Sequence, residues 1–90
     1  MHKAQVHETH PHILKRLKRA EGQVRSIAAM IESGRPCLEI AQQLQAVESA
    51  IRAAKKTLIH DHIDHCLDEA ADGRAARASI EEFKTVAKYL

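Results

Sequence analysis

Apolar residues recur along two long stretches of this chain at the spacing of a helix face. In the first stretch they follow one another in steps of 4, 3, 4, 3 and 4: Ile13, Leu17, Ala20, Val24, Ile27 and Ile31. In the second stretch the steps are the same: Ile40, Leu44, Val47, Ile51, Ala54 and Leu58. Such steps place the apolar side chains on one face of an α-helix. The pattern therefore predicts two long amphipathic helices.

Glycine and proline residues mark the ends of these helices. Thr9 or His10 can cap the first helix, and Gly34 stops it, because glycine adopts the left-handed conformation at a helix end without strain. Pro36 suits the first turn of the second helix, which meets no helix breaker before Gly73 and is expected to run for about thirty residues.

A third, shorter helix is predicted after Gly73. Ser79 and Glu82 have the spacing of a capping box, which favours a helix start at Ser79. The apolar positions that follow are Ile80, Phe83, Ala87 and Leu90. We expect an all-α fold, with a flexible N-terminal segment at residues 1–10 and a single helical domain over residues 11–90.

Three helices of these lengths do not enclose a core within one chain. A hairpin of two amphipathic helices leaves one apolar stripe in water, and a chain of 90 residues buries little surface by itself. A homodimer forming an antiparallel four-helix bundle would cover both stripes.

Composition narrows the class of protein further. Lys plus Arg is 14 and Asp plus Glu is 12, and 44% of the residues are hydrophobic, which excludes wholesale disorder. Aromatic residues make up 2%, which disfavours sheet-rich folds and base-stacking binders of single strands. No apolar run suits a membrane span or a signal peptide, so we expect a cytoplasmic protein. No catalytic triad, phosphate loop or paired carboxylates indicate an enzyme.

The face of the second helix ends in side chains that bind metals. Cys37 lies three residues before Ile40, whereas His62 and Cys66 follow Leu58 at steps of four. His62 and Cys66 are one helical turn apart and can reach one metal ion. Cys37 precedes His62 by 25 residues, which is roughly 37 Å of helix at about 1.5 Å per residue.

A second, antiparallel copy of the helix removes this separation. It brings Cys37 of one chain beside His62 and Cys66 of the other, with the twofold axis near Ala50 and Ile51. The same antiparallel dimer would then bury the apolar stripes and assemble the metal ligands. The alternatives are that the cysteines are small core residues or form a disulfide between chains.

Two thiolates and one imidazole favour Cu(I), which accepts three ligands, whereas Zn(II), Ni(II) and Co(II) usually take four or more. His7 and His65 are candidate additional ligands.

Basic residues gather on the first helix and in the middle of the second. Besides Arg25, they are Lys15, Arg16, Lys18, Arg19, Arg52, Lys55 and Lys56. Acidic residues concentrate instead at positions 61–72, so the charges are segregated along the chain. The basic residues could contact phosphates of double-stranded DNA, or they could simply be solvated helix faces. No helix-turn-helix, zinc finger or basic zipper is present.

Four segments resemble the CsoR, RcnR and FrmR family of repressors that sense metals or formaldehyde. They are RLKRAEGQV (16–24), PCLEIAQQLQAVESAI (36–51), HDHIDHC (60–66) and IEEF (80–83). The resemblance implies an all-α dimer that pairs into a homotetramer, and a single domain, residues 11–90, that both senses metal and binds operator DNA. It further implies that the apo-form represses metal efflux genes and leaves DNA when inducer binds.

The Cys37, His62 and Cys66 set is similar to that of the copper-sensing branch, which implies Cu(I) ligation by these residues. The resemblance also implies that Glu82 reaches the imidazole of His62 and that Arg16 contacts DNA. Pro36 departs from the tyrosine that this branch often has at that position.

Two alternatives keep different parts of this hypothesis. The same repressor could sense Ni(II), Co(II), Zn(II), formaldehyde or persulfide. In the second alternative, the chain is a helical bundle that buffers metal and has no role on DNA.

Overall fold

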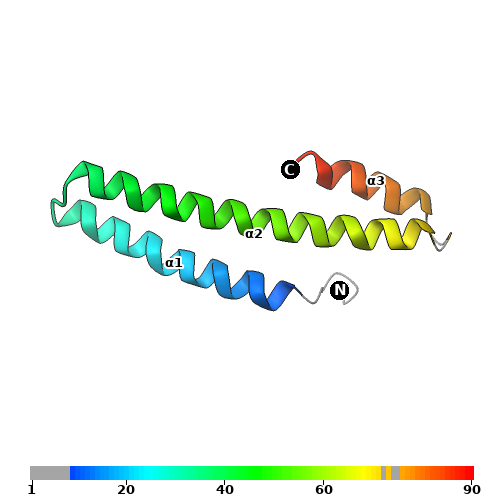
Figure 1. The fold of residues 1–90 in the computed structure, drawn as a ribbon, viewed down its shortest axis with the longest axis horizontal. Coiled ribbons are helices and arrows are strands. Elements are labelled where there is room, and N and C mark those ends of the chain that lie inside the picture. The colour runs from blue at the N-terminus through cyan, green and yellow to red at the C-terminus, as the bar shows by residue number, and fades with distance from the viewer. Residues whose placement is uncertain (1–8, 72, 74–75) are drawn as a thin grey trace. The chain divides into compact units, whose positions relative to one another are not determined.

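The computed structural model describes residues 9–71, 73 and 76–90, which form three α-helices (Figure 1). Helix α1 spans His10–Glu32, α2 spans Cys37–Ala71 and α3 spans Ala76–Ala87. No strand occurs within these ranges, and the predicted all-α class is confirmed. Of the N-terminal segment that we expect to be flexible, residues 1–8 lie outside the described residues.

The turn between α1 and α2 follows the predicted glycine stop. Gly34 has a φ of 75°, a left-handed conformation that a side chain would strain. The amide of Gly34 donates to the carbonyl of Ile31, at 3.2 Å, and that of Arg35 donates to the carbonyl of Met30, at 2.9 Å. These two bonds form a Schellman motif, which satisfies the last carbonyls of α1. Helix α2 begins directly after Pro36, whose carbonyl accepts from the amide of Ile40 at 3.2 Å.

The chain divides into two compact units, and the first, Pro11–Ala54, is a helical hairpin. It contains α1 and the first part of α2 (Figure 1). Each apolar stripe is split between two environments. Alternate members are withdrawn from water: Ile13, Ala20, Ile27, Val47 and Ala54 are buried, and Ile40 is half-buried. The members between them stay exposed: Leu17, Val24, Ile31, Leu44 and Ile51. Apolar side chains of both helices are therefore left in water, as the sequence predicted for a hairpin of two amphipathic helices.

The second unit contains the described residues from Lys55 to Leu90 together with Thr9 and His10. In it α3 lies beside the last part of α2 (Figure 1). Thr9, directly before α1, donates a hydrogen bond of 2.6 Å from Oγ1 to Oδ2 of Asp61. Ile59 and Cys66 of α2 are buried in this unit.

Helix α3 begins earlier than the capping-box pattern predicted. It starts at Ala76, so Ser79 is inside the helix rather than at its start. The hydroxyl of Ser79 bonds to Glu69 instead of capping, and Glu82 contacts α2. The packed face is consequently rotated from the predicted one: Ser79 is buried, whereas Ile80 is exposed. The prediction of a cap at Ser79 was wrong because a partner outside the helix engages its hydroxyl.

None of the helices formed by the described residues combines the length and the hydrophobicity that crossing a membrane requires.

Candidate metal centre

The last part of α2 places an imidazole and a thiol on one face. His62 and Cys66 are four residues apart, and one helical turn separates them. The side chain of His62 is 14% exposed and Cys66 is 1% exposed. Both groups are therefore largely withdrawn from water, an environment that strengthens their interactions with neighbouring charges.

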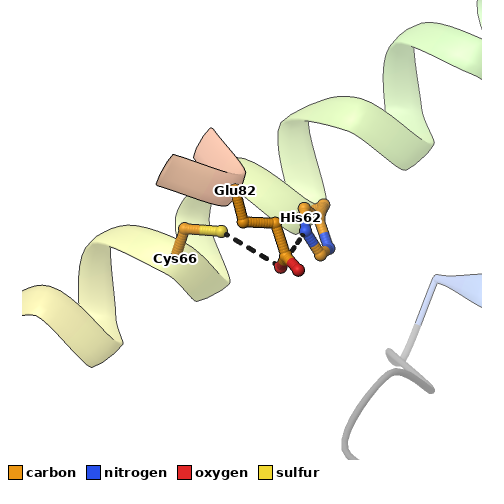
Figure 2. Close-up of side chains that lie close together, drawn as sticks. All are labelled: His62, Cys66 and Glu82. Carbon is orange, nitrogen blue, oxygen red and sulfur yellow. Dashed lines mark hydrogen bonds and ion pairs between the residues drawn. The ribbon is translucent and has the colours of Figure 1, made fainter. Parts of the chain in front are cut away.

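A carboxylate from α3 lies between these two side chains (Figure 2). Oε2 of Glu82 is 2.6 Å from Nε2 of His62, and Sγ of Cys66 donates to the same oxygen at 3.7 Å. One nitrogen, sulfur or oxygen atom from each residue lies within 4.8 Å of those of the other two. Among the described residues, these three form the one such group of His, Cys, Asp and Glu side chains.

The Cys66 thiol is held in its protonated form. Burial raises the pKa of Cys66, and the charge of Glu82 and its hydrogen bond with the thiol raise this pKa further, with a smaller contribution from Glu69. A metal ligand must be the thiolate, so a cation that binds here displaces the thiol proton.

The donor set of this group suits a soft or borderline metal. A thiolate and an imidazole are the ligands that Cu(I) and Zn(II) take in proteins, and a carboxylate beside an imidazole commonly orients it for ligation. His62 and Cys66 supply two donors from one chain, whereas Cu(I) would take three. The arrangement therefore fits a metal site to which a further ligand is added.

The structure brings together some of the predicted site residues and not others. His62, Cys66 and Glu82 lie in one group, but Cys37, which is exposed at the first position of α2, is not part of it. Nε2 of His65 lies 3.5 Å from Oε2 of Glu69, outside the group. His7 lies outside the described residues.

The predicted DNA-contacting residues are all exposed: Lys15, Arg16, Lys18, Arg19, Arg52, Lys55 and Lys56. Arg52 lies 3.9 Å from Glu48, a loose pair between solvated side chains. Of the five lysine and arginine residues of α1, the four that were predicted to contact DNA form no ion pair with any other residue that the structure describes.

One polar contact near the site was missed by the sequence reasoning. Oγ of Ser79 donates to Oε1 of Glu69 at 2.9 Å and so joins α3 to α2. Hydropathy treats serine as a solvent-facing residue, and Glu69 belongs to a run of acidic residues, so neither position carries a local signal of this contact.

Comparisons with known proteins identify the family to which this chain is similar. The family model described as metal-sensitive transcriptional repressor matches residues 9–89. The copper-sensing transcriptional repressor RicR of Mycobacterium tuberculosis is 44% identical over an alignment of 72 residues, and the match covers 72% of this chain and 75% of that protein. The copper-sensing transcriptional repressor CsoR of Bacillus subtilis is 40% identical over 76 residues, 84% of this chain and 75% of that protein. No solved structure matches the chain significantly.

The chain belongs to the family of metal-sensitive transcriptional repressors. This is a family of regulators rather than of enzymes, and a transcriptional repressor has DNA as its partner.

Proposed function

We propose that the chain is a copper-responsive repressor, in which Cu(I) is the inducer and His62 and Cys66 supply two of its ligands. The observation that supports this most is the buried pair of imidazole nitrogen and thiol sulfur, with the carboxylate of Glu82 2.6 Å from the imidazole. The copper-sensing relatives from Mycobacterium tuberculosis and Bacillus subtilis support the choice of metal.

The third ligand is Cys37 of a second chain. Cys37 and His62 belong to one α-helix and are separated by 25 residues, or roughly 37 Å at about 1.5 Å per residue. An antiparallel partner helix supplies the missing thiol. The exposed apolar residues of the Pro11–Ala54 hairpin support such a dimer, because pairing would bury them. We further propose that dimers pair into a homotetramer.

The apo-protein holds operator DNA through the basic residues of α1 and of the middle of α2. We assign Arg16 to this surface together with Lys15, Lys18 and Arg19, and the support is that all four are exposed in α1. Lysine and arginine side chains bind DNA phosphates by charge, and their binding releases counterions and weakens with salt.

Inducer binding is coupled to DNA release through the dimer. A ligand set drawn from both chains ties the start of one α2 to the end of the other. The two chains then settle in a different relative orientation, which no longer matches the spacing of DNA phosphates. A negative coupling of about 1–3 kcal/mol between the two ligands would weaken operator binding by roughly 5- to 150-fold. Genes for metal efflux or resistance would then be transcribed.

Anaerobic titration tests this proposal directly. Metal-free protein bound to fluorescent DNA from its own upstream region is titrated with Cu(I), Zn(II) and Ni(II), and metal stoichiometry and DNA anisotropy are recorded together. We expect Cu(I) to bind at about one ion per chain, as twofold symmetry requires, and to release DNA at that ratio. Release by Zn(II) or Ni(II) alone would contradict Cu(I) as inducer, and tight Cu(I) binding by a protein that never binds DNA would contradict the repressor.

The chemical alternatives have a separate readout. Formaldehyde or persulfide would modify cysteine covalently, and mass spectrometry of the denatured chain would detect the added mass. We expect DNA release without any covalent change. Release that requires a modified cysteine would overturn the metal proposal.

A further inference from the structure

A second polar contact joins α3 to α2 one turn away from Glu82. Oγ of Ser79 donates a hydrogen bond of 2.9 Å to Oε1 of Glu69. Ser79 is 4% exposed, and among residues 9–71, 73 and 76–90 it is the only buried polar or charged side chain. A buried hydroxyl that loses its partner costs free energy, so this hydrogen bond favours one placement of α3 over others.

The two helices contribute one carboxylate each to this interface. Glu69 of α2 accepts from Ser79 of α3, while Glu82 of α3 contacts His62 and Cys66 of α2. Ser79 and Glu82 are three residues apart, so they project from the same face of α3. Two polar contacts about one turn apart fix both the rotation of α3 and its position along α2.

Apolar packing alone determines this register weakly. Helix α3 has 12 residues, and Ser79 is its only buried residue among those described. Isolated helices of this length are marginal in water. The side chain of Glu82 is 47% exposed, so it is held by its contacts with α2 rather than by packing on all sides. The position of Glu82 therefore depends on where the backbone of α3 is held.

We propose that the hydrogen bond between Ser79 and Glu69 is a positioning contact for the metal site. It holds α3 in the register that keeps Glu82 against His62 and Cys66. Neither Ser79 nor Glu69 belongs to the group of His62, Cys66 and Glu82, and their contact affects the site by holding Glu82 in position. The inference rests on the proposed function, because its consequence is measured as Cu(I) binding.

Four variants test the contact. Ser79→Ala removes the donor, and Ser79→Thr keeps a hydroxyl at the same place. Glu69→Ala removes the acceptor from a more exposed side chain, so it leaves no empty space in a core. Thr85→Ala is the matched control, because the hydroxyl of Thr85 is exposed on α3 and bonds to the carbonyl of Glu81 in the same helix.

Two readouts are needed, Cu(I) affinity by competition with a chromogenic chelator and the ¹⁵N resonances of the His62 ring in metal-free protein. We expect Ser79→Ala and Glu69→Ala to weaken Cu(I) binding about tenfold, the lower end of what is lost when a residue that orients a ligand is removed. Both variants should also shift the Nε2 resonance of His62, which reports the carboxylate beside it. Ser79→Thr should restore both values, and Thr85→Ala should change neither.

The outcomes distinguish a failure of the positioning role from a failure of the proposed copper-responsive function. Wild-type Cu(I) affinity and an unchanged His62 resonance in Glu69→Ala would overturn the positioning role, even if Ser79→Ala unfolds α3. The same holds if Thr85→Ala has the effect of Ser79→Ala. Failure of the proposed function would appear in the unsubstituted protein, as DNA binding that Cu(I) does not alter.

Discussion

Oε2 of Glu82 lies 2.6 Å from Nε2 of His62, although the two residues belong to different helices. The contact engages one of the two ring nitrogens of His62. A carboxylate on the second nitrogen fixes the tautomer of an imidazole and raises its basicity as a ligand. Helix α3 is thereby connected to the candidate metal site through Glu82.

Removing this carboxylate should weaken metal binding without preventing it. Glu82→Gln keeps the size of the side chain but loses the charge, and we expect Cu(I) affinity to fall by about 10- to 100-fold. Glu81→Gln is the control, because Glu81 is an exposed neighbour paired with Lys84. Chelator competition measures both. Equal affinities for the two variants would mean that Glu82 does not act on the site.

Mixed dimers should show that each site is built from two chains. Neither Cys37→Ala nor Cys66→Ala homodimers should release DNA with Cu(I). A heterodimer of the two variants, purified through two different tags, contains one intact set of Cys37, His62 and Cys66 if the ligands come from opposite chains. We expect about one tightly bound Cu(I) per heterodimer, by the same twofold symmetry. A heterodimer without tight Cu(I) binding would rule out the shared site.

Arg16 should contribute to operator binding through its charge. Arg16→Ala is expected to weaken binding across DNA sequences and to reduce the slope of log affinity against log salt by about one. Arg77→Ala, which removes an exposed arginine of α3, is the matched control. Anisotropy titrations between 50 and 200 mM salt, the range over which such contacts are lost, measure both quantities. An unchanged slope would remove Arg16 from the DNA-contacting surface.

The stability of the metal-free protein should fall in alkaline solution. Burial, and next Glu82, raise the pKa of the Cys66 thiol in the folded chain. Below the ordinary thiol pKa of about 8.5, both folded and unfolded chains keep the proton, and the contribution to stability is complete. As the pH rises further, the unfolded chain ionises first, so the free energy of unfolding decreases until the pH passes the folded pKa.

Urea denaturation under reducing conditions, at fixed protein concentration between pH 7 and 10, measures this decrease. Cys66→Ala should flatten the pH dependence, because it removes the shifted group. Cys37→Ala, which removes the exposed thiol, should retain most of it. The same slope in Cys66→Ala and wild type would assign the decrease to other groups.

Periodicity was enough to predict the helices, but not how each apolar stripe is used. Ile13 and Leu17 are equally apolar and one turn apart, yet the first is buried in the hairpin and the second is exposed. Hydropathy cannot distinguish them, because the choice depends on how α1 and α2 face each other. What the pattern did predict is that one stripe of a hairpin has no partner within it.

The site shows the same division between local and long-range information. The spacing of His62 and Cys66 within one helix was sufficient to place them together. Glu82 was expected from the resemblance alone, since its contact depends on how α3 lies on α2. The contact of Ser79 with Glu69 had no sequence signal, because it joins two helices across the turn at Gly73 and neither residue type indicates it.

The exposed stripe supplies the last prediction, in which assembly and metal binding fail together. Ile51 is 45% exposed in the single chain and lies near the expected twofold axis. Ile51→Lys would place two like charges close together at the axis of an antiparallel dimer, and burying an unpaired charge is costly. We expect a monomer by analytical ultracentrifugation, and loss of tight Cu(I) binding because Cys37 no longer meets His62 and Cys66.

The control for this change is Leu38→Lys, at an apolar position that is 70% exposed and lies outside the stripe. It should leave both assembly and Cu(I) affinity close to those of the wild type. An Ile51→Lys monomer that still binds Cu(I) tightly would place the whole ligand set within one chain, and an unchanged dimer would move the interface away from this stripe. A site shared between antiparallel α2 helices requires that Ile51→Lys lose both dimer assembly and tight Cu(I) binding, and that Leu38→Lys keep both.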